Sequence, residues 1–348
     1  MFSKNGMEDL LEKVFQKMAG ANQDNSNDHM DFETWEWPVG VGLYGLYKYY
    51  RHSGKKQYRD LMIRWYERRL TAGLPAKNVN TVAPLLTLAC LYEEEPRPEF
   101  LNLCKEWAEW IMKEMPRTEE GGLQHITAVS ENREQLWDDT LFMTVLFLAK
   151  MAVLTDNQAY RDEAVYQFLL HIKYLTDLPS GLWYHGWSFE GRHHFGKLKW
   201  ARGNSWFTAG VVEFLELCGP TGPVREYLLT ALRAQVKTLA ALQDAAGLWH
   251  TLLDDGSSYL EASAAAGFGY GILKGVRRGY LAPQYRETGM KAARGVIGCI
   301  AADGTVNQVS YGTAIGDNAA HYKSIPICPT AYGQALTIML LAEVLEEV

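Results

Sequence analysis

The stretch that decides the fold class is GNSWFTAGVVEFLELCGPTGPVREYLLTALRAQVKTLAAL, residues 203–242. Apolar residues recur at helical spacing over 203–217 and again over 223–242, which predicts two helices. The link between them, Gly219–Gly222, is short, and a short link makes consecutive helices antiparallel neighbours. The expected building unit of the fold is therefore a helix hairpin.

The same periodicity continues along the chain and predicts about twelve helices. Links after the even-numbered helices are short, whereas links after the odd-numbered helices are mostly long. In a closed ring of hairpins, all the long links emerge on one rim, where functional loops gather. The expected helices are 7–19, 38–52, 56–71, 79–93, 96–114, 136–154, 158–174, 203–217, 223–242, 259–278, 283–300 and 329–346, and the long links are 19–37, 115–135, 175–202, 243–258 and 301–328.

This pattern predicts an all-α fold, an (α/α)6 barrel of six inner and six outer helices that forms one domain over residues 1–348. Three long links share a Gly-Leu-x-His pattern, as a repeated unit would. An open array of stacked helical repeats is the competing architecture, but irregular spacing and aromatic-rich loops favour the closed ring. The repeated segments are Gly122-Leu123-Gln124-His125, Gly181-Leu182-Trp183-Tyr184-His185 and Gly247-Leu248-Trp249-His250.

Composition narrows the choice of partners. The net charge of -7 at pH 7 argues against nucleic acid or an anionic membrane as a partner. A small anionic molecule remains compatible, because one local Arg or His can bind one carboxylate. The five cysteines are scattered without a Cys-x-x-Cys pair, and residues 1–20 lack the pattern of a signal peptide. We expect a cytoplasmic protein that is a monomer or a weak homodimer.

The first chemical cluster is Gln135-Leu136-Trp137-Asp138-Asp139-Thr140-Leu141-Phe142-Met143. One of its two acids is expected to be a helix N-cap, and Asp138 fits that role. Asp139 lies between Trp137 and an apolar run, so we expect a desolvated carboxyl with a raised pKa. Such a carboxyl can donate a proton near neutral pH and then act as a base.

The second cluster is Trp200-Ala201-Arg202-Gly203-Asn204-Ser205-Trp206. Arg202 stands between two tryptophans at a helix start, where it could pair with a carboxylate or form a salt bridge that holds the loop. Upstream, His185 lies among aromatic residues. Many tryptophans fall in or beside long links, and flat aromatic faces suit sugar rings. They are Trp35, Trp37, Trp137, Trp183, Trp187, Trp200, Trp206 and Trp249.

Other motifs point less clearly to chemistry. His321 and Lys323 could contact an anion or be solvated, and Asn80 could bind sugar or cap a helix. Gly40-Val41-Gly42-Leu43-Tyr44-Gly45 spells a dinucleotide motif, but no strand precedes it, so close helix packing is the better interpretation. His193-His194 has no carboxylate at ligand spacing, and no metal is expected.

Together the Trp137–Met143, Tyr184–Trp187 and Trp200–Trp206 motifs resemble the unsaturated rhamnogalacturonyl hydrolases, glycoside hydrolase family 105. The resemblance runs from Trp35-Glu36-Trp37 to the last helix. The chain departs from the family pattern in two places. Ser205 replaces an expected Gly, and amides surround Asn80 where some relatives have an acid.

The resemblance implies an (α/α)6 barrel and an unusual reaction. Pectin lyases leave a C4=C5 double bond in the terminal uronic acid, and these hydrolases hydrate that vinyl ether. By analogy, Asp139 protonates C4 and accepts a proton from the water that adds at C5. The implied substrate is a small unsaturated galacturonyl oligosaccharide, with no cofactor, metal, nucleic acid or membrane. The implied substrate-binding residues are Trp37, Asn80, His125, Trp137, His185, Trp200, Arg202, Trp206 and His321.

Three alternatives remain at this point. A conventional inverting glycosidase would pair Asp139 with a distant acid such as Asp31 or Asp254. An unsaturated glucuronyl hydrolase would act on glycosaminoglycan or other lyase products. A non-catalytic carbohydrate-binding toroid would use the aromatic rim without needing Asp139.

Overall fold

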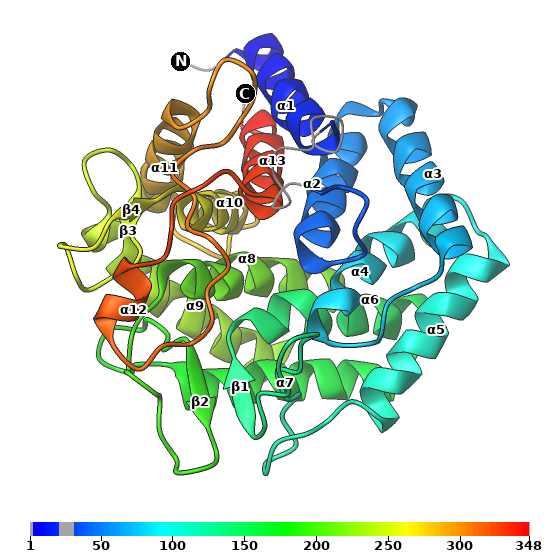
Figure 1. Cartoon of the computed structure of the whole chain (residues 1–348), viewed down its shortest axis with the longest axis horizontal. Helices are drawn as coiled ribbons and strands as arrows, with labels where there is room; N and C mark the ends of the chain where they lie inside the picture. The colour runs from blue at the N-terminus through cyan, green and yellow to red at the C-terminus, as the bar shows by residue number, and fades with distance from the viewer. Residues whose placement is uncertain (1–2, 21–30, 348) are drawn as a thin grey trace.

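The computed structural model describes residues 3–20 and 31–347. Long helices dominate this part of the chain, and they follow one another around a ring (Figure 1). They are α1 (Lys4–Ala19), α2 (Trp37–Ser53), α3 (Lys56–Ala72), α4 (Val79–Glu94), α5 (Pro98–Lys113), α6 (Leu146–Leu154), α7 (Gln158–Leu175), α8 (Ala201–Leu217), α9 (Gly222–Leu242), α10 (Ala262–Arg277), α11 (Arg286–Gly298) and α13 (Ala331–Leu345). Shorter helical segments are η3 (Leu141–Val145), η4 (Pro283–Tyr285) and α12 (Ala319–Lys323).

Six helices form a closed inner ring. Helix α2 packs on α4, α4 on α6, α6 on α8, α8 on α10, and α10 on α13, which returns to α2. The other six, α1, α3, α5, α7, α9 and α11, each pack outside one or two inner helices. In Figure 1, α1 (blue) lies beside α13 (red), so the first and last helices close the structure. The predicted (α/α)6 barrel is confirmed.

The inner helices are buried because they are apolar on nearly every side. Every residue of α13 is buried, and α8 is buried from Ala201 to Leu215. Glycines allow close contacts between them. A Cβ at Gly40 would lie 2.6 Å from the backbone nitrogen of Pro84, and one at Gly45 would lie 3.1 Å from that of Met339. The glycines of residues 40–45 therefore serve helix packing, as predicted.

One large apolar core contains side chains from α1 through α13. The single domain stays a prediction, which this shared core supports. Within residues 3–20 and 31–347, no helix combines the length and apolar character needed to cross a bilayer.

The predicted helices agree with the structure except at two starts. The helix predicted from residue 136 is preceded by strand β1 (Gln135–Trp137) and begins as the π-helical turn η3. The helix predicted from residue 259 begins at Ala262, after strand β4 (Leu260–Glu261). Helix α12 was not predicted, and residues 21–30 of the long link 19–37 lie outside the described residues.

The long loops gather at the N-terminal ends of the inner helices. Strand β1 pairs antiparallel with β2 (Gly186–Ser188), and β3 (Trp249–His250) pairs with β4. The Gly-Leu repeats form similar tight returns after outer helices. At Gly247, φ is +87°, and an added Cβ would lie 2.2 Å from the carbonyl oxygen of Lys291, so only glycine fits there.

The opposite end of the barrel carries a cluster of charged side chains around a second cavity. Glu213 is fully buried in α8 and accepts hydrogen bonds from Tyr44, Tyr270 and Lys274. Lys48 lies 2.9 Å from the same carboxylate. Because the C-terminal ends of the inner helices converge here, lysines and arginines also complement their dipoles.

Candidate active site

A cavity of about 560 Å³ opens on the loop-bearing rim, at the N-terminal ends of α2, α4 and α8. This volume lies within the range of small-molecule sites. Helix N-termini carry partial positive charge, so several of them around one cavity favour an anionic ligand. The cavity is lined by Trp37, Asn80, His125, Thr127, Val129, Ser130, Asn132, Gln135, Trp137, Asp139, Met143, Phe195, Trp200, Arg202, Gly312, Thr313, Ala314, Ile315 and Asp317.

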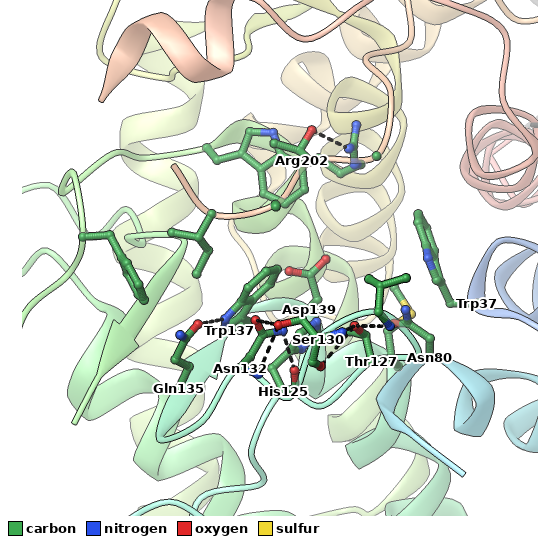
Figure 2. A pocket seen from close by; sticks show the side chains of 18 of the residues that line it. Trp37, Asn80, His125, Thr127, Ser130, Asn132, Gln135, Trp137, Asp139 and Arg202 are labelled. Carbon is green, nitrogen blue, oxygen red and sulfur yellow. Dashed lines mark hydrogen bonds between the residues drawn. The ribbon is translucent and has the colours of Figure 1, made fainter. Parts of the chain in front are cut away.

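Asp139 lies between the end of β1 and the start of η3. The backbone N–H of Asp138 donates to the carbonyl of His185 (3.2 Å), which fixes the segment beside β2. The side chain of Asp139 is 17% exposed and reaches the cavity, and its Oδ2 lies 3.7 Å from Nε2 of His185. In Figure 2, Asp139 lies between Trp137 and Trp37, with Arg202 above it.

His125 and Trp137 form a flat wall beside Asp139. Their rings stack at 4.3 Å with an interplanar angle of 4°. Nδ1 of His125 lies 2.9 Å from Oγ1 of Thr140, and the Trp137 indole N–H donates to Oε1 of Gln135 (2.9 Å). Burial lowers the pKa of His125 to about 4, so it is neutral at pH 7. The pair offers an aromatic face with fixed orientation.

His185 is 2% exposed, and its ring lies 4.2 Å from that of Trp200. Its Nδ1 is 2.7 Å from the hydroxyl of Tyr322, which also accepts the backbone N–H of Gly316 (3.2 Å). With the Tyr322 hydroxyl donating to Nδ1, the imidazole proton lies on Nε2 and faces Asp139. Burial lowers the pKa of His185 against the opposing effect of Asp139.

The raised pKa predicted for Asp139 belongs instead to Asp138. Burial, together with the charge of Asp139, raises the pKa of Asp138 well above its ordinary value. Burial also acts to raise the pKa of Asp139, but the contact with His185 and the charges of His185 and His125 outweigh it and lower the pKa. Asp139 therefore ionises first, and Asp138 keeps its proton. Asp138 directly precedes the first helical residue, Asp139, but its carboxyl oxygens make no capping hydrogen bond.

Arg202 lines the cavity, but its guanidinium is already engaged. Nη1 donates to the carbonyl and hydroxyl of Ser310 (3.0 and 2.7 Å), and Nη2 donates to the carbonyl of Tyr311 and the hydroxyl of Thr313 (3.1 and 3.2 Å). Glu261 lies 3.7 Å away. Arg202 thus fixes the 310–313 loop, which forms one cavity wall, through hydrogen bonds.

The remaining predicted residues occupy different positions. Trp37 lines the cavity and stacks on Tyr332 at 4.7 Å. Trp206 is fully buried and packs edge-on against Trp37 at 5.8 Å, so it supports that ring and has no exposed surface for a sugar. Asn80 lines the cavity. The N-cap of α4 is Asn78, so Asn80 does not have the capping role considered for it. His321 is not among the lining residues.

His321 holds the far loop in place. Its Nε2 lies 2.9 Å from the carbonyl oxygen of Ala314, which lines the cavity. We therefore expect His321 to act on a ligand only through this loop.

Sequence reasoning missed two walls of the cavity. One comes from residues 127–135, with Thr127, Ser130 and Asn132, and the other from residues 312–317. Phe195 also lines the cavity and has φ of +53°, a strained backbone for a non-glycine residue that is frequent at functional sites. The amide- and hydroxyl-rich composition of loop 127–135 was the one signal that could have indicated it.

Asp138, Asp139 and His185 are the one group of acids and histidines in the described residues whose donor atoms could hold a metal, all within 4.8 Å. They supply three donors, and one of them favours its protonated form. A protonated carboxyl is a poor cation ligand. The expected absence of a metal stays a prediction.

The chain is similar to several known proteins over nearly its whole length. The unsaturated rhamnogalacturonyl hydrolase YesR of Bacillus subtilis is 34% identical over 320 residues, which cover 91% of each chain. A crystal structure of a possible member of family 105 from Klebsiella pneumoniae is 47% identical, with a TM-score of 0.95, and the match covers 100% of this chain and 94% of that chain. A similar structure from Salmonella enterica serovar Paratyphi A is 45% identical, with a TM-score of 0.96 and coverage of 100% and 95%.

The protein is thus a glycoside hydrolase built on an (α/α)6 barrel. A family model described as Glycosyl Hydrolase Family 88 matches residues 12–348, and the chain belongs to that family. The resemblance that the sequence motifs indicated is confirmed.

Proposed function

We propose that the enzyme releases a terminal 4,5-unsaturated uronic acid from small pectin-derived oligosaccharides by hydration of the C4=C5 vinyl ether. The observation that carries this proposal is the position of Asp139, a carboxyl beside His185 in an aromatic cavity. Direct attack at an anomeric carbon usually requires two carboxyls at a set separation. Hydration of a vinyl ether needs only one that gives a proton and takes one back.

The proposed reaction begins when Asp139 transfers a proton to C4. The π electrons of C4=C5 form the new C4–H bond, and the ring oxygen stabilises the cation left at C5. Water then forms a bond to C5, and Asp139 accepts the proton that the water loses. The resulting hemiketal opens and expels the remaining sugar.

The substrate carboxylate is expected to lie near the helix N-termini. Arg202, the cation with five donors in a rigid fork, lines this part of the cavity, but its four Nη protons already bind the 310–313 loop. We propose that Arg202 acts mainly by holding this wall and adds its charge to the local field. His185 does not line the cavity, and its buried Nε2 faces Asp139 at 3.7 Å, so its proposed role is to orient the carboxyl that handles the water.

The aromatic residues are proposed to hold the sugar rings. Trp37, Trp137 and Trp200 line the cavity, with Asn80 and His125 between them. We favour a galacturonyl substrate because the similar protein YesR, an unsaturated rhamnogalacturonyl hydrolase, matches nearly the whole chain. Unsaturated glucuronyl substrates from glycosaminoglycans are the alternative. We also propose a cytoplasmic enzyme that is a monomer or a weak homodimer.

A conventional inverting glycosidase is the second candidate. Neither Asp31 nor Asp254 lines the cavity, and Asp254 is paired with Lys199 at 3.0 Å. Asp317 is the other acid among the lining residues, on the opposite loop, and it would have to be the second carboxyl. Retained turnover of an unsaturated substrate by Asp317→Asn would speak against that pairing.

The proposal is tested by following ultraviolet absorbance in the enol-uronate band. Purified enzyme is mixed with lyase-digested rhamnogalacturonan and, separately, with lyase-digested glycosaminoglycan. We expect the absorbance to fall with the first substrate and to stay constant when Asp139→Asn replaces the wild type. A fall only with the second substrate would indicate the glucuronyl alternative, and no fall with either would favour the conventional inverting glycosidase.

A further inference from the structure

Asp138 is a buried carboxyl that the proposed reaction does not yet use. Its side chain is 0% exposed, and neither of its oxygens has a hydrogen-bond partner. An unpartnered carboxylate in an apolar interior is costly, so such a group persists in its neutral, protonated form. A side chain that served packing alone would be better replaced by an apolar residue.

The fold leaves a specific space for this carboxyl. Gly203 lies in the first turn of α8, and a Cβ built there would be 2.1 Å from Oδ2 of Asp138 and 2.7 Å from Cγ. Any side chain at residue 203 would therefore displace the acid.

Asp138 lies directly behind the proposed acid. One oxygen each of Asp138 and Asp139 and Nε2 of His185 lie within 4.8 Å of one another. Asp139 is 17% exposed and faces the cavity, whereas Asp138 has no access to it. The raised pKa of Asp138 and the lowered pKa of Asp139 agree with one proton held on the inner carboxyl.

We propose that Asp138 is a positioning residue that stores the proton which Asp139 delivers to C4 of the substrate. The proposal rests on the vinyl-ether hydration proposed above. It resolves a conflict in that reaction, since Asp139 must act as an acid although its contact with His185 favours the ionised form.

When substrate covers Asp139, the O–H bond of Asp138 breaks and an O–H bond forms on Asp139. Asp139 then gives that proton to C4, and both carboxyls are briefly ionised. Water adds to C5 and loses a proton to Asp139. Asp139 then passes this proton back to Asp138. One water molecule is consumed, and the pair regains its original single proton.

His185 is a weaker candidate for this store. Burial lowers its pKa, so at neutral pH it carries only the proton of its neutral ring. That proton faces Asp139 and serves orientation. Asp138 is the one neighbouring group whose surroundings favour an extra proton.

The test is Asp138→Asn, which keeps the size and neutral charge of a protonated carboxyl but cannot release a proton. We expect kcat on an unsaturated disaccharide to fall by about 100-fold or more, with KM changed by less than about threefold. The residual kcat should rise as pH falls, because Asp139 then depends on protons from solvent. Asp303→Asn, at an exposed acid paired with Lys17 far from the cavity, is the matched control.

Wild-type kcat and an unchanged pH profile in Asp138→Asn would overturn the proposal, because a structural role would survive this isosteric change. Where the variant does not fold, carbon-13 NMR of wild-type enzyme labelled at the aspartate carboxyl replaces it. We expect one aspartate carboxyl to remain protonated at pH 7. A spectrum in which every aspartate carboxyl is ionised at pH 7 would overturn the proposal. A wild type that does not hydrate the vinyl ether refutes the proposed function separately.

Discussion

Replacement of Gly203 by alanine tests the role of the Asp138 carboxyl by changing the residue that packs against it. Gly203 and Gly210 both lie in α8, and both are helical positions where alanine is intrinsically favoured by about 1 kcal/mol. A Cβ at Gly210 would lie 3.6 Å from Phe142, an ordinary contact. A Cβ at Gly203 would lie 2.1 Å from Oδ2 of Asp138. The same substitution in one helix therefore has two different expected results.

The size of the effect follows from these distances. Ordinary contact begins at 3.4 Å, so in Gly203→Ala the Cβ and the Asp138 oxygen must separate by about 1 Å. A displacement of about 1 Å in a catalytic arrangement costs on the order of 100-fold in rate. We expect kcat/KM of Gly203→Ala to fall by about that factor, while Gly210→Ala keeps wild-type activity and gains up to about 1 kcal/mol of stability.

The assay is the decrease in ultraviolet absorbance of an unsaturated disaccharide, with the free energy of unfolding measured in urea for each variant. Kinetics are compared only where each variant is folded at the assay temperature. Activity of Gly203→Ala within about threefold of Gly210→Ala would refute the reasoning, because it would show that the position of Asp138 has no effect on the reaction.

Three further predictions concern stability and the cavity wall. Glu213→Gln removes one of the two carboxylates that contact buried Lys274, and Glu216 remains. It should cost about 1.5–3 kcal/mol in urea unfolding, or about 3 °C in Tm. Glu109→Gln at an exposed pair should change little, and equal losses would contradict this. Burial lowers the pKa of His171 to about 4, below the unfolded value of about 6.5. As pH falls, the unfolded chain therefore binds the proton first. The free energy of unfolding should decrease as pH falls from about 6.5 to about 4, by up to about 1.4 kcal/mol per pH unit. His171→Gln should flatten that loss, and an unchanged slope would disprove the assignment. Arg202→Ala should release the 310–313 loop and raise KM by at least about tenfold; unchanged binding of a uronate product would remove Arg202 from the site.

Much of the fold could be predicted from the sequence because its determinants are local. Helical periodicity and link length identified the hairpins, and the ring follows from their succession. The wrong helix boundary at residue 136 occurs where the structure depends on contacts between residues far apart in the sequence. Gln135–Trp137 continues the apolar pattern of the following helix, but it pairs with Gly186–Ser188 and becomes a strand instead. Helix α12 is too short to show a periodic pattern.

The sequence predicted the types of residue in the candidate site better than their burial, their protonation and their hydrogen-bond partners. Asp139 and Arg202 both line the cavity, and His185 lies buried beside Asp139. Which of two adjacent acids is buried depends on a space at Gly203 that no local pattern reveals. Similarly, Arg202 is held by Ser310 and Thr313, more than one hundred positions along the chain, and that pairing exists only in the fold.

The central claim is that the C4=C5 bond, and not the anomeric carbon, is the point of attack. The most direct test compares two disaccharides that differ only in that double bond, one saturated and one unsaturated, in the same assay of released sugar. We expect turnover of the unsaturated disaccharide and none of the saturated one, with Asp139→Asn inactive on both. Comparable kcat/KM on the two substrates would contradict vinyl-ether hydration and identify an ordinary glycosidase.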